Sequence, residues 1–119
     1  MSPALGPWLS AFLFTQAVEV PIYTRALGRF PVSLAARLAI AFGASALTHP
    51  IVWFVIPSLH HGSYATLVLR AELFAVLVEG FYLYALGAFD LRRSMLWSLA
   101  ANGASASLGL ACRALFGWP

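Results

Sequence analysis

Residues 65–89 read ATLVLRAELFAVLVEGFYLYALGAF, and this stretch decides the fold class. It is long enough to cross the hydrocarbon core of a bilayer as an α-helix, which takes about 20 residues. Most of its side chains are apolar, yet it contains Arg70, Glu72 and Glu79. Acids within such a stretch are typical of a membrane span whose polar groups face the interior of a helix bundle. The stretch therefore predicts a transmembrane helix with one polar face.

The composition of the whole chain agrees with this prediction. Of the 119 residues, 61% are hydrophobic and only 9% are charged, whereas a soluble domain carries about 25% charged residues. So few charges do not cover a surface that water must wet. A surface in contact with lipid needs no such cover. We therefore expect an integral membrane protein whose main partner is the lipid bilayer.

Three further apolar stretches accompany residues 65–89, and all four are joined by short connections. The predicted spans cover residues 8–27, 33–56, 65–89 and 94–116. No linker or shift in composition divides the chain, so residues 1–119 form a single transmembrane domain. The predicted fold is all-α: a polytopic bundle of four transmembrane helices with short loops.

The arginines predict how the chain is oriented. Its seven basic residues are all arginine, and five of them lie in the loop regions 25–37 and 90–93. Basic residues are enriched in cytoplasmic loops of membrane proteins. We therefore expect these two loops in the cytoplasm and both termini outside. The basic residues form no stripe of the kind that binds nucleic acid, and no nucleic-acid partner is expected.

Five polar residues fall inside the predicted spans, and they are the candidate functional residues. An acid at the centre of a membrane helix costs about 2.5–3.5 kcal/mol on insertion scales. Such groups therefore face the bundle interior, pair with one another or line water. The predicted pathway for an ion consists of Glu19, His49, Glu72, Glu79 and Asn102.

Depth and helical phase predict which of these residues meet. At a rise of 1.5 Å per residue, Glu19, Glu79 and Asn102 lie at one level, with His49 and Glu72 at a level nearer the outside. Glu72 and Glu79 are seven residues apart, so they share one face of their helix. We expect two polar layers joined along that face.

These residues favour a small transporter or channel that moves a proton or a small cation, including a metal ion. Four helices form a thin bundle, so a homo-oligomer is expected. One alternative is an accessory, non-catalytic subunit of a larger membrane complex. Another is an intramembrane enzyme that uses Glu and His as acid and base. A purely structural role is also open, since interhelical hydrogen bonds stabilise membrane bundles by about 0.6 kcal/mol each.

Cofactor binding stays open at this point. His49, Glu72 and Glu79 offer the nitrogen and oxygen ligands of a divalent metal ion. The sequence contains no nucleotide-binding motif. Its single cysteine, Cys112, excludes an internal disulfide and any CxxC motif.

Overall fold

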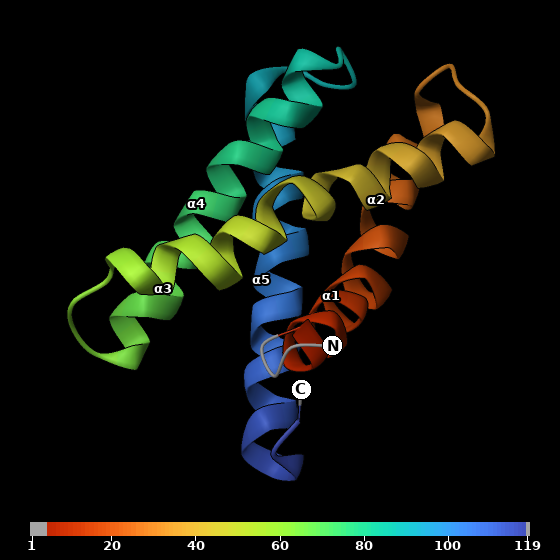
Figure 1. Cartoon of the computed structure of the whole chain (residues 1–119). Coiled ribbons are helices and arrows are strands. Elements are labelled where there is room, and N and C mark those ends of the chain that lie inside the picture. The colour runs from red at the N-terminus through yellow and green to blue at the C-terminus, as the bar shows by residue number, and fades with distance from the viewer. Residues whose placement is uncertain (1–4, 119) are drawn as a thin grey trace.

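The computed structural model describes residues 5–118 of the chain (Figure 1). Helices account for 87% of these residues, and they form four long helices with no strand among them. The predicted all-α fold class is therefore confirmed.

The helices follow one another with short connections. Helix α1 covers Leu5–Ala26 and is followed by a 3₁₀ turn, η1, at Leu27–Arg29. Helix α2 (Leu34–Pro50), the π-helical turn η2 (Ile51–Val55) and α3 (Ile56–Leu59) together form one continuous helix. The last two helices are α4 (Tyr64–Ala85) and α5 (Leu91–Phe116).

Side-chain caps begin three of these helices. Ser33 and Ser63 accept hydrogen bonds from the backbone N–H groups three residues further on, at 3.1 and 3.2 Å. Asp90 does the same at the start of α5, where Oδ1 accepts from the N–H of Arg93 at 2.8 Å. Each cap satisfies one of the N–H groups that a helix leaves without an internal partner. The caps explain why the helices start where they do.

Two local features set the shape of the middle helices. The π turn η2 follows Pro50 directly, because proline has no N–H and interrupts the regular hydrogen-bond pattern. Helix α4 ends at Ala85, earlier than the predicted end at residue 89. The chain turns there through Gly87, whose φ of 75° suits glycine.

The four long helices pack as a ring. Helix α1 packs mainly against α2 and α5, and α4 packs against the same two helices. Helices α1 and α4 therefore lie diagonally across the ring. Residues 27–33 and 86–90 form turns at one end of the bundle, whereas the turn at residues 60–63 lies at the other end with the start of α1 and the end of α5 (Figure 1).

Polar side chains make up about half of the buried residues. They line the inner faces of all four long helices, at Gln16, Glu19, Ser45, Thr48, Glu79, Ser94, Ser98, Asn102 and Ser105. The apolar core is small and rich in alanine, and it lies toward the end with the turns at residues 27–33 and 86–90. Tyr23, Leu27 and Leu83 are its largest members and are fully buried.

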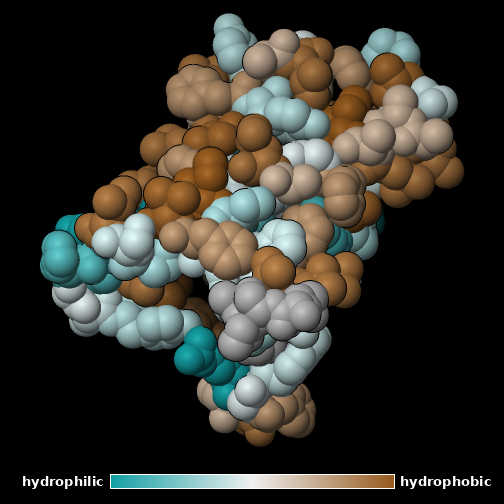
Figure 2. All heavy atoms as spheres, in the orientation of Figure 1, coloured by the Kyte–Doolittle hydropathy of each residue, from teal (hydrophilic) through white to brown (hydrophobic). Residues whose placement is uncertain are grey.

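Large hydrophobic side chains cover the outside instead. Leu13, Leu69 and Leu99 are 58%, 69% and 56% exposed, although each lies well inside a long helix. Figure 2 shows hydrophobic side chains spread over much of the visible face, with the most hydrophilic ones gathered mainly at its left and lower ends. Exposed apolar surface of this extent marks contact with lipid or with other proteins.

One helix of the described residues, Leu34–Leu59, is long and apolar enough to cross a membrane, judged by length and hydropathy alone. Its most apolar stretch has a mean hydropathy of 1.7 and is only 28% buried. Helix α4 is also long, but it contains three charged residues, Arg70, Glu72 and Glu79.

Candidate functional site

Two carboxyl groups from diagonally opposite helices meet in the centre of the ring. Glu19 projects from α1 and Glu79 from α4, and each is only 1% exposed. Both line the same small cavity, whose volume is about 90 Å³. Because α1 and α4 are not direct neighbours in the ring, the two acids approach each other through its interior.

Glu79 accepts a hydrogen bond on each of its oxygens. The hydroxyl of Tyr23 on α1 donates to Oε1 at 2.8 Å. The hydroxyl of Thr48 on α2 donates to Oε2 at 2.7 Å. These two hydrogen bonds connect Glu79 of α4 to α1 and to α2.

Glu19 is held in the same way. The hydroxyl of Ser105 on α5 donates to Oε1 at 2.6 Å, and the hydroxyl of Ser45 on α2 donates to Oε2. All four carboxyl oxygens of Glu19 and Glu79 therefore accept from neutral hydroxyl groups. Neither acid is hydrogen-bonded to a cationic side chain of the described residues.

Asn102 completes the polar centre from α5. Its Nδ2 donates to the backbone carbonyl of Ser98 at 2.9 Å and approaches the Tyr23 hydroxyl at 3.4 Å. The Ser98 hydroxyl donates to the carbonyl of Val76 on α4 at 2.8 Å. The amide thus supports the hydroxyl that donates to Glu79, and the network reaches all four long helices.

His49 and Glu72 lie on the side of the acid pair nearer to the turn at residues 60–63. The His49 ring packs among aromatic side chains, 5.5 Å from the ring centre of Phe12 and 6.3 Å from that of Trp53. Nδ1 of His49 and Oε2 of Glu72 are buried, and neither has a hydrogen-bond partner among the described residues. Two polar atoms are therefore available to water or to a ligand here.

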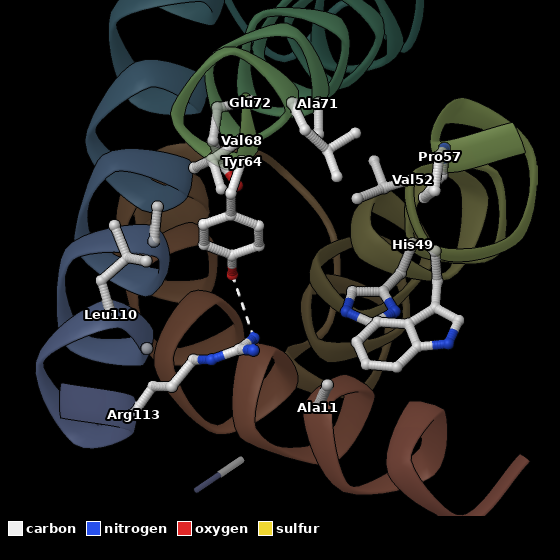
Figure 3. Close-up of a pocket in the computed structure, with 14 residues that line it drawn as sticks. Ala11, His49, Val52, Pro57, Tyr64, Val68, Ala71, Glu72, Leu110 and Arg113 are labelled. Carbon is white, nitrogen blue, oxygen red and sulfur yellow. Dashed lines mark hydrogen bonds between the residues drawn. The ribbon is translucent and has the colours of Figure 1, made fainter. Parts of the chain in front are cut away.

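All five residues singled out from the sequence line the 90 Å³ cavity. His49 and Glu72 also line a second cavity of about 350 Å³. Figure 3 shows this outer cavity, with His49 and Glu72 on facing walls and Arg113 reaching toward Tyr64. The Arg113 guanidinium donates to the Tyr64 hydroxyl at 3.1 Å. The two cavities share walls and run from the acid pair toward the end of the bundle where Tyr64 begins α4.

On the other side of the acid pair, toward the turns at residues 27–33 and 86–90, the interior of the bundle is closed. Tyr23 lies one turn beyond Glu19 on α1, and Leu83 lies one turn beyond Glu79 on α4. Together with Leu27, these side chains fill the interior and are fully buried. The site is thus approached by cavities on one side and blocked by packed side chains on the other.

The predicted metal ligands do not form a ligand set. Between residues 5 and 118, no group of three His, Cys, Asp or Glu side chains lies close enough together to hold a metal ion. His49, Glu72 and Glu79 line one cavity, but they do not converge on one point. A resident metal ion held by these three residues finds no support in this arrangement.

Sequence reasoning missed several members of the network. Tyr23 follows Glu19 by four residues, and Ser45 precedes Thr48 by three, so both pairs carry the spacing of a shared helix face. That signal was available for both. Tyr82 has the same spacing from Glu79, but its hydroxyl donates to the carbonyl of Ile40 at 3.0 Å and takes no part in the site.

Comparison of the chain with models of known protein families, with curated protein sequences and with solved structures gives no match. The function is therefore argued from the site itself.

Proposed function

We propose that this chain is an integral membrane protein whose four long helices span a bilayer. The distribution of side chains supports this, since polar groups fill the interior and large hydrophobic groups cover the outside. Helices of 22–26 residues reach about 33–39 Å at 1.5 Å per residue. That length matches a hydrocarbon core of about 30 Å crossed at a tilt.

The orientation that we propose follows the arginines. The loop regions 25–37 and 90–93 face the cytoplasm, and both termini lie outside. In support, Arg25, Arg29 and Arg93 line one cavity at one end of the bundle. Arg113 and Tyr64 lie together at the other end, which is then the outer one.

Within this bundle, the proposed function is transport of a proton or a small cation through the Glu19–Glu79 pair. The observation that carries this proposal is that two carboxyl groups from diagonal helices share one buried cavity with His49, Glu72 and Asn102. Two adjacent carboxylates repel each other, and binding a proton or a cation relieves that repulsion. A purely structural contact would be made at lower cost by Gln or Ser.

The cavities suggest a route to the pair from outside. The ion enters the outer cavity, passes Glu72 and His49, and reaches Glu19 and Glu79. The inner cavity of about 90 Å³ has room for about three water molecules, at roughly 30 Å³ each. Water, together with Nδ1 of His49 and Oε2 of Glu72, which have no partner among the described residues, then relays the proton or coordinates the cation.

Release on the cytoplasmic side requires movement of the side chains that close the site. Tyr23 belongs to this closure and also donates to Glu79. A hydrogen bond to an ionised acceptor is stronger than one to a neutral acceptor. Loading Glu79 with a proton therefore weakens its hold on Tyr23. This coupling favours a carrier whose closure responds to the occupancy of the acid pair over a permanently open channel.

The test is ion flux in proteoliposomes with the purified protein. Under an imposed gradient, a dye inside the vesicles reports entry of protons or of a chosen cation. The variants Glu19→Gln and Glu79→Gln keep the size of the side chain but remove its charge, and flux falls to the level of empty vesicles. A control variant, His61→Gln in the turn outside the site, retains flux. Unchanged flux in a correctly folded Glu79→Gln variant would refute transport through this pair.

We also propose a homo-oligomer, and a specific observation keeps the accessory-subunit alternative in view. The small residues Ala100, Gly103 and Ser107 of α5 are exposed, and a Cβ atom added at Gly103 would meet nothing within 4 Å. Small residues allow close approach of a second helix in a membrane. Crosslinking in native membranes distinguishes the two proposals: a second copy appears in a homo-oligomer, and a different protein in stoichiometric amount indicates a larger complex.

A further inference from the structure

Three arginines surround a cavity at the end of the bundle opposite the outer cavity. Arg25 comes from the last turn of α1, Arg29 from η1 and Arg93 from the first turn of α5. All three line one hollow of about 640 Å³. The acid pair lies outside this hollow, beyond the packed side chains that close the transport site.

The arginines meet because of helix geometry. Arg25 and Arg29 are four residues apart, which brings them to one side of the chain where α1 runs into η1. Helix α5 starts at the same end and packs against α1, so its first turn brings Arg93 alongside. The three cationic groups reach the hollow from two antiparallel segments.

No acid balances these charges inside the hollow. Its lining contains no Asp or Glu among the described residues. The nearest acid along the chain, Asp90, caps α5 through the N–H of Arg93. The guanidinium groups of Arg25, Arg29 and Arg93 donate no hydrogen bond to any described residue, whereas those of Arg70 and Arg113 each have a side-chain partner. Three guanidinium groups with open donors form a site for an anion.

The remaining walls are apolar and lead out along the bundle. Phe89, Leu96, Trp97 and Ala100 line the hollow beside the arginines. Leu96 and Leu99 are 54% and 56% exposed, so the apolar wall continues onto the outer face of α5. A Cβ atom added at Gly28 would meet nothing within 4 Å, so the hollow is open on this side. A ligand that fits has an anionic head and a long apolar body.

We infer that this hollow binds the phosphate headgroup of an anionic phospholipid, with an acyl chain lying along α5. Basic pockets between helices on the cytoplasmic side of a membrane suit such headgroups, and Trp97 has the amphipathic ring that prefers the membrane boundary. This inference depends on the proposed membrane location but not on transport by the acid pair.

The experiment measures lipid binding to the purified protein in detergent. Phosphatidylglycerol with brominated acyl chains quenches tryptophan fluorescence when it binds beside Trp97. Brominated phosphatidylcholine has the same chains and a zwitterionic head. We expect saturable quenching by the anionic lipid at concentrations where phosphatidylcholine has little effect. Replacing Trp97 by Phe removes most of the quenching.

Charge-neutralised variants locate the site. The double variant Arg29→Gln/Arg93→Gln binds the anionic lipid about 25-fold more weakly, since each arginine near an anionic headgroup contributes about fivefold. The matched control Arg70→Gln/Arg113→Gln removes the same charge at the other end and leaves affinity unchanged. If the double variant is not monodisperse, lipid affinity is measured instead with single variants at Arg25 and at Arg29.

Three results would overturn the inference. Equal binding of the two lipids excludes recognition of the anionic head. Equal loss in both double variants shows an effect of total charge and not of this hollow. Full competition by inorganic phosphate at equimolar concentration identifies a site for free phosphate. Flotation of reconstituted vesicles is measured alongside: a protein that does not float with lipid refutes the membrane location, whereas one that floats without preferring the anionic lipid refutes this inference alone.

Discussion

The hydroxyl of Tyr23 connects the candidate site to the closure beneath it. It donates a hydrogen bond to Glu79 at 2.8 Å and accepts one from the Asn102 amide at 3.4 Å. The same side chain is fully buried in the apolar core next to the site. A change of one atom at this residue therefore affects both the acid and the packing that closes the site toward the turns at residues 27–33 and 86–90.

We predict that Tyr23→Phe alters ion flux clearly while lowering the free energy of unfolding only slightly. The lost interhelical hydrogen bond costs about 0.6 kcal/mol on average in a membrane protein, while Glu79 loses one of its two donors. Tyr82→Phe is the matched control, because its hydroxyl donates to the carbonyl of Ile40 and not to an acid. Unfolding in mixed micelles and flux in proteoliposomes are measured for both variants. Equal flux in the two variants would show that Tyr23 has no role beyond packing.

The polar residues themselves were accessible from the sequence, but their hydrogen bonds were not. Glu72 and Glu79 share a face through their spacing of seven, and the depth of Glu19 matches that of Glu79. Which donor each oxygen uses depends on how α1, α2 and α5 are ordered around α4. One sequence does not contain that order, so the roles of Tyr23 and Thr48 became visible only in the structure.

At the scale of elements, close contact between α4 and α5 holds the ring together around the site. Gly80 of α4 faces Met95 of α5 with no room for a Cβ atom between them. The contact lies one residue from Glu79. The glycine thus lets α5 approach closely enough for Ser98 and Asn102 to join the polar network.

We predict that Gly80→Leu lowers the free energy of unfolding by about 1–3 kcal/mol, the usual cost of overpacking. Gly103→Leu is the control on the outer face of α5, where a Cβ atom meets nothing within 4 Å. Thermal unfolding in detergent separates the two variants. Comparable losses would mean that the α4–α5 contact is not tighter than the outer surface. A shift of Gly103→Leu from oligomer to monomer would identify that face as the contact between copies.

Helix bounds illustrate what local sequence can specify. The starts of α2, α4 and α5 follow from capping residues visible in the sequence. The end of α4 at Ala85 also has a local signal in Gly87, whose φ of 75° is the left-handed conformation that commonly ends a helix. Hydropathy alone hides this signal, because residues 86–89 are as apolar as the helix before them.

At the scale of the whole molecule, the two ends of the bundle differ in charge and in access to the interior. One end has the outer cavity that leads to the acid pair. The other has the hollow with three arginines and lies beyond the closed core. This asymmetry suits a protein that takes its ion from outside and is anchored by anionic lipid at the cytoplasmic surface.

The orientation is tested with single cysteines in a Cys112→Ala background. A membrane-impermeant maleimide added to intact cells labels His61→Cys, which lies in the turn at the outer end. Leu91→Cys at the opposite end is labelled only after the cells are made permeable. Labelling of Leu91→Cys in intact cells, with protection of His61→Cys, would reverse the proposed orientation.

The central claim is that the Glu19–Glu79 pair binds a proton or a cation inside the bundle. Infrared difference spectra of the protein in lipid vesicles observe this directly, because a protonated carboxyl group has its own carbonyl stretch. We predict a buried carboxyl band that grows as the pH falls, is reduced by a competing cation if one is carried, and shrinks in the Glu19→Gln/Glu79→Gln variant to the part contributed by Glu72. A spectrum in which the double variant matches the wild-type protein at every pH and cation concentration would contradict the account.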